Sequence, residues 1–217
     1  LDAKTQAEEA HALLTRQGLP ADHVRWLDTD EARAVAGMAV PSGGWLFEQG
    51  GWLHPAGYAS HLLQEAQSWR AQGQPLLMCL WGHAAHRIRP TEQGWEVLDA
   101  QGQHIAEAPS LVLANAHQAA TLLSTLPPEH AVATLPLSRV RGQISAWPEV
   151  SGASEAVRLP HLPVAGSGYV LPLRQDCLLF GATTQHHDED PAIRDADHRH
   201  NLKQAARLGA CAEYPAD

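Results

Sequence analysis

The sequence has few cysteines and no long hydrophobic run. Its three cysteines, Cys79, Cys177 and Cys211, are scattered, and no two of them form a CxxC pair. Such usage is typical of a reducing compartment, so we expect free thiols and a cytoplasmic location. No apolar run approaches the ~18 residues that a membrane helix needs, and the first residues lack the basic and apolar regions of a secretory signal. The sequence therefore predicts neither a disulfide framework nor a membrane protein.

Three widespread site motifs are also missing. The sequence contains no P-loop for phosphates and no G-x-S-x-G turn for a nucleophilic serine. It contains no G-x-G-x-x-G turn either, because Gly166-Ser-Gly168 is followed by Tyr169, Val170 and Leu171. The formal net charge is −9, whereas free nucleic-acid-binding domains are usually basic. We therefore do not expect this segment alone to bind phosphate backbones strongly.

Four segments have the apolar spacing and end signals of helices. They are residues 3–16, 28–37, 55–73 and 191–208. In the second, Asp28 and Glu31 have the spacing of a capping box, and in the third Pro55 suits a first helical turn. Within the third, a helical stripe is predicted to be core; it consists of Tyr58, Leu62, Ala66 and Trp69. The chain opens at Leu1 inside a predicted helix, and we expect it to be a piece of a longer protein.

Strand patterns account for most of the remaining apolar residues. Residues 43–47 predict a short strand, and 76–81 a strand buried on both faces. Alternation around Gln101-Gly102 predicts a β-hairpin, and 168–172 with 177–183 predict another. We therefore predict an α+β fold: a mostly antiparallel sheet beside a smaller layer of β-meander and helix. The segments expected to share that sheet are those around Trp45, Arg141, Tyr169 and Phe180.

One stretch, Ser110 to Leu123, has the pattern of a central buried strand. Its apolar run Leu111–Ala114 suits a strand buried on both faces. The small residues Ala114, Asn115 and Ala116 then let a backbone approach a ligand closely, and a helix starting there would direct unpaired N–H groups at it. An ordinary buried strand and turn explains this stretch equally well by itself.

Fourteen histidines raise the question of a metal site. The densest group is His186-His187-Asp188-Glu189-Asp190, with two further histidines nearby. Zinc needs ligands that converge in a defined geometry, and this group lies at a predicted loop and helix start, where acids are favoured by the helix dipole. We therefore predict a solvated acidic loop and no metal site.

Five runs together resemble the FAD-dependent D-amino-acid-oxidase-like family. Within that family they are most similar to the C-terminal oxidoreductase domains of bacterial bifunctional tRNA enzymes that complete 5-methylaminomethyl-2-thiouridine. The resemblance extends from about Trp45 to the end of the chain. The runs are Gly50-Gly-Trp-Leu-His-Pro-Ala56, Leu111-Val-Leu-Ala-Asn-Ala-His-Gln118, Leu135-Pro-Leu-Ser-Arg-Val-Arg-Gly-Gln143, Gly168-Tyr-Val-Leu-Pro172 and Phe180-Gly-Ala-Thr183.

The resemblance implies a domain organisation. Residues 1–47 and 131–217 would be two segments of a substrate-binding domain, and residues 48–130 a portion of the FAD domain. The family's Gly-rich turn for the FAD pyrophosphate would precede Leu1, and a closing glycine-rich segment would follow Asp217. The resemblance also implies fusion to an S-adenosylmethionine-dependent methyltransferase domain. This chain alone is therefore expected to lack part of its active site.

The resemblance also implies site residues. Ala114, Asn115 and Ala116 match the strand end beside the flavin cofactor, and residues 84–86 match, more loosely, the strand at the adenine end. Arg141, Gly142 and Gln143 match the segment that crosses near the isoalloxazine ring. Tyr169 matches a position that helps to hold the substrate carboxylate. From the residues alone, a surface charge at Arg141 and a half-buried strand aromatic at Tyr169 remain open.

The implied reaction is oxidation of a secondary amine. Carboxymethylaminomethyl-(2-thio)uridine at the wobble position of tRNA would give the aminomethyl-uridine and glyoxylate. FAD does the redox chemistry and the protein orients and desolvates; charge-assisted bonds to the carboxylate would fix the reacting methylene. Two alternatives stay open. One is a small-amino-acid oxidase or dehydrogenase of the glycine or sarcosine type, and the other is a non-enzymatic acidic domain that binds a protein or metal.

Overall fold

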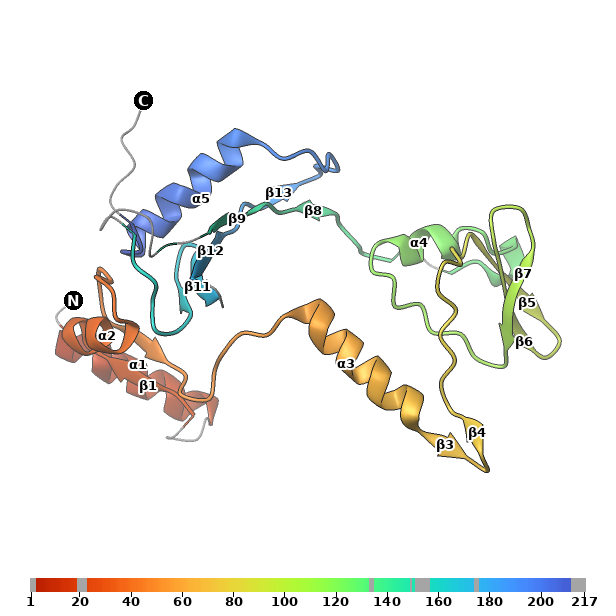
Figure 1. The fold of residues 1–217 in the computed structure, drawn as a ribbon, viewed down its shortest axis with the longest axis horizontal. Coiled ribbons are helices and arrows are strands. Elements are labelled where there is room, and N and C mark those ends of the chain that lie inside the picture. Colours follow the sequence, from red (N-terminus) through yellow and green to blue (C-terminus); the bar gives the residue numbers. More distant parts are fainter. Residues whose placement is uncertain are drawn as a thin grey trace. The chain divides into compact units, whose positions relative to one another are not determined.

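The computed structural model describes residues 3–18, 23–132, 135–148, 150, 157–173 and 176–211 (Figure 1). The chain divides into two compact units, Leu1–Leu53 with Val140–Asp217 and His54–Arg139. Both units combine helices with antiparallel strands, so the predicted α+β class is confirmed. None of the described helices is long and apolar enough to cross a membrane.

The first part of unit 1 follows its sequence signals closely. Its elements are α1 (Ala3–Gln17), β1 (Arg25–Leu27), α2 (Thr29–Ala36) and β2 (Gly44–Leu46). Asp28 accepts hydrogen bonds from the backbone N–H groups of Asp30 and Glu31, and the Glu31 side chain accepts from the Asp28 N–H at 3.0 Å. The capping box therefore satisfies N–H groups that a helix start leaves unpaired. Strands β1 and β2 pair antiparallel.

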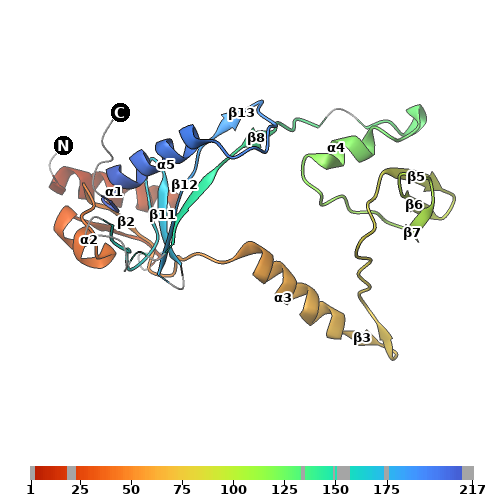
Figure 2. The ribbon, with the colours of Figure 1, turned by 45° about the horizontal axis from the view of Figure 1, so that its top comes forward.

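The second part of unit 1 is a four-stranded antiparallel sheet covered by one helix. Its strand order is β10-β11-β12-β9, and the predicted hairpin β11–β12 is confirmed. Helix α5 lies along β9, β11 and β12 (Figure 2). The elements are β9 (Ile144–Trp147), β10 (Val164–Ala165), β11 (Tyr169–Leu173), β12 (Cys177–Gly181) and α5 (Asp195–Arg207).

The hydrophobic core of unit 1 lies largely between this sheet and α5. Val170, Leu178 and Phe180 are 0%, 1% and 3% exposed, and Ala205 of α5 is 2% exposed. Residues from the α2 end of the unit, including Met38, belong to the same cluster. Helix α5 begins later than the sequence predicted, because Arg194 before it has extended backbone angles. Its buried face is what holds it to the sheet.

The expectation of one sheet joining the segments near Trp45, Arg141, Tyr169 and Phe180 is wrong. Strand β2, with Trp45, pairs only with β1 among the described strands. Strand β8 (Val140–Arg141) pairs with β13 (Gln185–His186). The ladder between this pair and β9–β12 is interrupted at Gln143, whose N–H is donated to the Thr183 side chain rather than to a backbone carbonyl. A side chain in place of a carbonyl ends the regular pairing there.

The described residues of unit 2 form a long helix, a hairpin, a three-stranded meander and a short helix. The meander is antiparallel in the order β5-β6-β7, which confirms the predicted hairpin around Gln101-Gly102. A 3-10 turn, Pro128–His130, follows the short helix. The other elements are α3 (Pro55–Ser68), β3 (Arg70–Ala71), β4 (Gln74–Pro75), β5 (Arg87–Thr91), β6 (Gly94–Leu98), β7 (His104–Ala108) and α4 (Gln118–Leu123).

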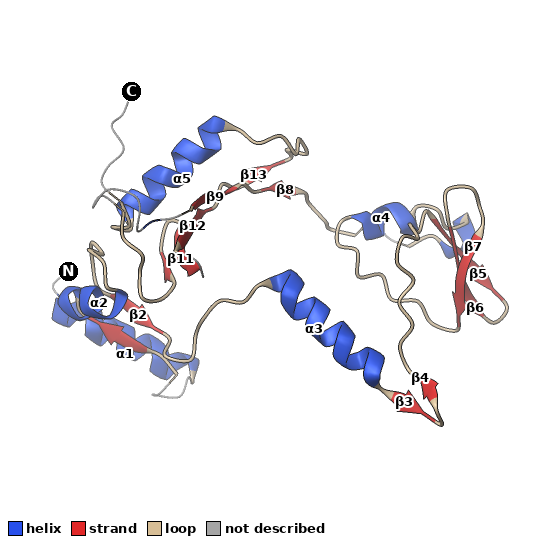
Figure 3. Cartoon of the chain, in the orientation of Figure 1, coloured by secondary structure: helices blue, strands red, loops and turns tan. Residues whose placement is uncertain are grey.

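Two predicted buried strands of unit 2 are loops instead (Figure 3). In residues 76–81 Met78 is 76% exposed, and in Leu111–Ala114 Val112 is 86% exposed. An apolar run becomes a buried strand only when strands on both sides bond its N–H and C=O groups. No described strand pairs with either run. Both predictions were therefore wrong for this chain.

The predicted core stripe of α3 is also not buried. Tyr58, Leu62 and Trp69 are 53%, 46% and 55% exposed, and no residue of α3 is buried. The helix begins where the sequence predicted, with Pro55 in its first turn, but it ends at Ser68 rather than near Gly73, so Trp69 follows the helix. An apolar stripe is buried only when another element packs on it. No described element contacts α3 extensively.

Candidate functional site

The segment that contains Arg141, Gly142 and Gln143 crosses from β8 to β9 with strict alternation. Residues 141, 143, 145 and 147 are buried or half-buried, whereas residues 140, 142, 144 and 146 are exposed. An extended backbone directs successive side chains to opposite sides. Arg141 and Gln143 therefore face one side of the segment, and Gly142 faces the other.

The side of the sheet that bears Tyr169 is not covered by α5. Tyr169 is opposite Gly181, and Gly181 is opposite Ile144, so these three residues form one row across the sheet. Ile144 is 51% exposed and Tyr169 is half-buried. The next row on the same side consists of Leu171, Leu179 and Ala146. We call this side the open face. It is an apolar surface with one phenol group.

The other side of the sheet is closed by α5. Its central row consists of Val170, Phe180 and Ser145, which are 0%, 3% and 4% exposed. Two buried polar residues of α5, Asp197 and Asn201, face the sheet and are 4% and 0% exposed. A buried polar group is costly unless it is hydrogen-bonded. The bonds of these two residues therefore explain how this side is held together.

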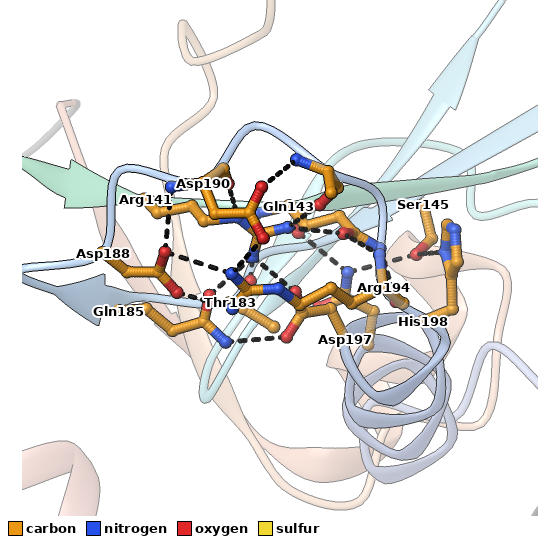
Figure 4. A network of polar contacts seen from close by, with 12 residues as sticks. Arg141, Gln143, Ser145, Thr183, Gln185, Asp188, Asp190, Arg194, Asp197 and His198 are labelled. Carbon is orange, nitrogen blue, oxygen red and sulfur yellow. Dashed lines mark hydrogen bonds and ion pairs between the residues drawn. The ribbon is translucent and has the colours of Figure 1, made fainter.

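Arg141 is the hub of a polar network between β8, β13 and α5 (Figure 4). Its Nη1 lies 2.5 Å from Asp197 Oδ2 and 2.5 Å from Gln185 Oε1. The two side chains of the ion pair are 9% and 5% exposed. The remaining donors of the guanidinium go to Gln143 Oε1 and to the carbonyls of Asp190 and Ala192. Arg141 is therefore not a surface charge, and its donors are all directed at protein groups.

Gln143 is held at every polar atom. Its N–H donates to Thr183 Oγ1 at 3.0 Å, and its carbonyl accepts from the Thr183 N–H and from Asn201 Nδ2. Its side chain donates to the Arg194 carbonyl and accepts from the Arg194 N–H, both at 2.9 Å. These bonds fix both the backbone and the side chain of Gln143. Only Gly142, between Arg141 and Gln143, turns its exposed backbone to the open side.

The acidic loop before α5 is tied to Arg194. The guanidinium of Arg194 bonds Asp188 at 2.5 Å and Asp190 at 2.8 Å. Hydrogen bonds from Arg194 hold the pKa of both carboxyls below their usual value, and Arg141 does the same for the pKa of Asp197. Among the described residues, no three histidine, cysteine or acidic side chains come together as a metal site.

A second branch of the network leads from Asn201 to His198. Asn201 Nδ2 donates to Ser145 Oγ at 3.1 Å, and Ser145 Oγ lies 2.7 Å from His198 Nδ1. The Ser145 hydroxyl can donate once and accept twice, so the direction of its bond with His198 Nδ1 follows the tautomer of the imidazole. The branch links the half-buried end of α5 to the inward residues of β9.

Sequence reasoning missed Asp197 and Asn201 of α5 and also Gln185, which donates a hydrogen bond to Asp197. A usable signal was present in the helix itself. Residues 197, 201 and 205 recur at four-residue spacing and are all buried in α5, so this is the buried face of the helix. Two polar residues at such positions predict a hydrogen-bond network beneath the helix. Their partners, which are 12 to 58 residues away in sequence, could not be identified without the fold.

The other predicted cofactor residues, Ala114, Asn115 and Ala116, belong to unit 2. Ala114 and Asn115 line a cavity of about 410 Å³ together with Ala84 and Ala85. Its remaining lining is mostly apolar. Ala116 has a positive φ of 51°, so the chain turns sharply there. The structure thus brings together the two segments whose backbones the resemblance assigned to the cofactor.

The described part of unit 2 offers an apolar slot but no place for a pyrophosphate. Helix α3 begins with Pro55, which has no N–H, and the His54 side chain accepts the Gly57 N–H at 2.8 Å. Helix α4 has six residues and is too short to present a strong N-terminal field. The residues present therefore fit planar, apolar parts of a flavin dinucleotide and do not fit its charged centre.

Curated relatives match nearly the whole chain. The chain is 42% identical over 211 residues to the tRNA 5-methylaminomethyl-2-thiouridine biosynthesis bifunctional protein MnmC of Methylibium petroleiphilum, which covers 97% of the chain. It is 36% identical over 189 residues to the MnmC protein of Paraburkholderia phymatum, which covers 87% of the chain. The chain spans 30% and 26% of the lengths of these two relatives.

Two solved structures share the fold. Glycine oxidase from Geobacillus kaustophilus superposes with a TM-score of 0.69 at 20% identity, covering 93% of this chain and 50% of its own. Iminodiacetate oxidase from Chelativorans sp. BNC1 gives a TM-score of 0.70 at 18% identity, covering 96% of this chain and 53% of its own. The family described as FAD dependent oxidoreductase matches residues 2–209. This chain therefore belongs to the FAD dependent oxidoreductase family.

Proposed function

We propose that this chain is the substrate-binding part, with a portion of the cofactor-binding part, of an enzyme that oxidises carboxymethylaminomethyl-(2-thio)uridine at the tRNA wobble position. The products would be the aminomethyl-uridine and glyoxylate. The observation that carries the proposal is the 42% identity to an MnmC protein over 97% of this chain. Because the chain spans 30% of that relative, the whole activity belongs to a longer protein. A tRNA substrate also implies the cytoplasm and is compatible with a fused methyltransferase domain.

The open face of unit 1 suits such a substrate. Its rows of Tyr169, Gly181 and Ile144 and of Leu171, Leu179 and Ala146 present apolar surface around one hydroxyl group. An apolar wall excludes water and strengthens the few polar contacts made against it. In the proposal the Tyr169 hydroxyl donates to the substrate carboxylate, which orients the methylene to be oxidised. When bound, FAD supplies the two-electron oxidation of the C–N bond.

The roles proposed for Arg141, Gly142 and Gln143 differ from one another. The guanidinium of Arg141 is engaged by Asp197, Gln185 and three further protein groups, so it holds the segment in place. Gly142 and the backbone beside it would face the flavin. Considered by itself, unit 2 would contribute the backbone of Ala114, Asn115 and Ala116 to flavin binding. A missing side chain at Gly142 suits the close approach of a flat ring.

A first test is the colour of the isolated chain. We expect residues 1–217, purified alone, to be colourless and inactive, because no described helix start in unit 2 is available to the pyrophosphate. Each lost charge-assisted hydrogen bond costs roughly 1.5–3 kcal/mol, and every 1.4 kcal/mol is about tenfold in affinity. The full-length protein should be yellow. Flavin absorbance co-eluting with the isolated chain at one equivalent would contradict this division of the cofactor site.

A second test is Tyr169→Phe in the full-length protein. Losing one hydrogen bond to a carboxylate should weaken turnover of the carboxylated tRNA roughly 10- to 100-fold in kcat/KM, for a contact worth about 1.5–3 kcal/mol. The FAD content should not change. Tyr58→Phe is a matched control, since Tyr58 is 53% exposed on α3. Loss of flavin with unchanged substrate affinity would make Tyr169 a cofactor or packing residue.

The same assay separates the alternatives. Turnover of free glycine or sarcosine in preference to modified tRNA would favour a small-amino-acid oxidase or dehydrogenase. A full-length protein without flavin or turnover of any amine would favour a non-enzymatic acidic domain. Both outcomes would refute the proposed substrate.

A further inference from the structure

Asn201 is fully buried on the face of α5 that packs on the sheet. It is 0% exposed, and its next neighbours on the same helix face are Asp197 and Ala205. Its Nδ2 donates to the Gln143 carbonyl at 2.9 Å and to Ser145 Oγ at 3.1 Å. Its Oδ1 has no hydrogen-bond partner among the described residues. Both donor protons of this side chain are therefore directed at the strand segment below α5.

The unpaired Oδ1 of Asn201 reduces what this residue contributes to stability. A buried polar atom without a partner costs about 1–3 kcal/mol, whereas an apolar residue would join the surrounding core of Val170, Phe180 and Ala205 without that cost. The two hydrogen bonds from Asn201 Nδ2 offset part of the cost. Polar residues that are retained in an apolar core are concentrated at functional sites, so we ask what these two bonds hold.

These two bonds hold the segment where the regular ladder is interrupted. The Gln143 N–H is donated to the Thr183 side chain instead of to a backbone carbonyl. Gln143 precedes β9, and backbone pairing gives it one bond, from the Thr183 N–H to its carbonyl. Asn201 restrains the inward carbonyl of Gln143 and the inward side chain of Ser145, which are two residues apart. Ile144 lies between Gln143 and Ser145, and Gly142 precedes Gln143. Both Ile144 and Gly142 are exposed toward the open face.

We propose that Asn201 is a positioning residue, which fixes the backbone from Gly142 to Ile144 at the open face by bonding Gln143 and Ser145 from behind. The inference rests on the proposed function for its catalytic consequence, because Gly142 is the predicted flavin neighbour. Asn201 itself lies beneath the sheet and touches neither substrate nor cofactor. It acts through the position and rigidity of the backbone from Gly142 to Ile144, which would face them. A displacement of about 1 Å at such a backbone can cost about 100-fold in rate.

The first experiment measures the backbone directly in the 217-residue chain. Asn201→Leu removes both donors and keeps a similar side-chain size. Ala205→Gly is the matched control, because Ala205 is 2% exposed one turn along the same helix face and its side chain has no polar atom that could bond Gln143 or Ser145. It weakens α5 by about 1 kcal/mol. Hydrogen exchange of residues 142–146 should rise at least about tenfold more in Asn201→Leu than in Ala205→Gly.

A third variant keeps the inference testable if Asn201→Leu does not fold. Ser145→Ala removes one of the two acceptors and leaves the bond from Asn201 to the Gln143 carbonyl. It should raise exchange at residues 144–146 and leave the amide of Gln143 close to its original rate. Equal exchange in all variants and the parent chain, or equal increases in Asn201→Leu and Ala205→Gly, would overturn the positioning role.

The second experiment uses the full-length protein. Asn201→Leu should retain FAD, shift the flavin absorption band, and lower kcat about 10- to 100-fold with KM changed less than about threefold. Ala205→Gly should leave kcat and the flavin spectrum unchanged. A kcat loss of the same size in both variants would mean that α5 is only structural. If the parent protein fails to turn over modified tRNA, the proposed function fails, whereas the exchange experiment still decides the positioning role.

Discussion

Leu178 and Leu179 are adjacent in β12 but lie on opposite sides of the sheet. Replacing each by alanine tests whether the open face is free of a covering element. Leu178 is 1% exposed beneath α5, whereas Leu179 is half-buried on the open face. Leu→Ala removes three carbon groups worth about 0.8 kcal/mol each when buried. At Leu178 the closed core also adds a cavity cost, so we expect a loss of about 3 kcal/mol. Leu179 is half-buried, so its replacement loses roughly half of this transfer free energy and leaves no closed cavity. We therefore expect the free energy of unfolding to fall by about 1 kcal/mol.

The measurement is native-state hydrogen exchange of the β12 amides in the full chain, which reports the free energy of opening of this sheet. A tenfold change in an equilibrium constant corresponds to about 1.4 kcal/mol. Exchange should therefore accelerate about 100-fold in Leu178→Ala and about fivefold in Leu179→Ala. Equal acceleration in the two variants would mean that both sides of the sheet are packed. The open face would then not be available to a substrate, and the reasoning for the proposed site would fail.

Three further predictions follow from local contacts. Arg141 lowers the pKa of Asp197, so the stability that this carboxylate contributes is present above its unfolded pKa and is lost as the pH falls below about 4; the melting temperature should fall less between pH 5 and pH 3 in Asp197→Asn than in the parent chain. Gly209→Ala should lower the melting temperature more than Gly18→Ala, because both have positive φ but only at Gly209 would a Cβ lie 2.2 Å from the Ala39 carbonyl oxygen; equal losses would refute the clash. Elemental analysis after dialysis against a chelator should find no stoichiometric zinc at His186, His187 and Asp188, since Asp188 is bound by Arg194.

Local signals in the sequence were sufficient for several elements. The capping box of Asp28 and Glu31, the first turn at Pro55 and the hairpin at Gln101-Gly102 all formed where they were predicted. Each depends on hydrogen bonds or backbone angles within a few residues, so the sequence contains everything that decides it. The family, too, could be identified from five short runs.

Predictions that needed distant partners failed. Leu111–Ala114 and residues 76–81 have the composition of buried strands but form loops, because no described strand pairs with them. The stripe of α3 is exposed for the same kind of reason, since no described element covers it. Apolar spacing determines which face of an element can be buried. Whether that face is buried depends on another element.

The candidate site divides in the same way. The sequence by itself determined that residues 168–172 and 177–183 form a hairpin that contains Tyr169, because strand and turn signals act within a few residues. Only the tertiary structure decided that Arg141 is engaged by Asp197 and that Asn201 holds Gln143, since these partners are 56 and 58 residues apart in sequence. It also decided which side of the sheet α5 covers. A hydrogen bond between distant residues exists only after the chain has folded, and for that reason no local pattern could predict it.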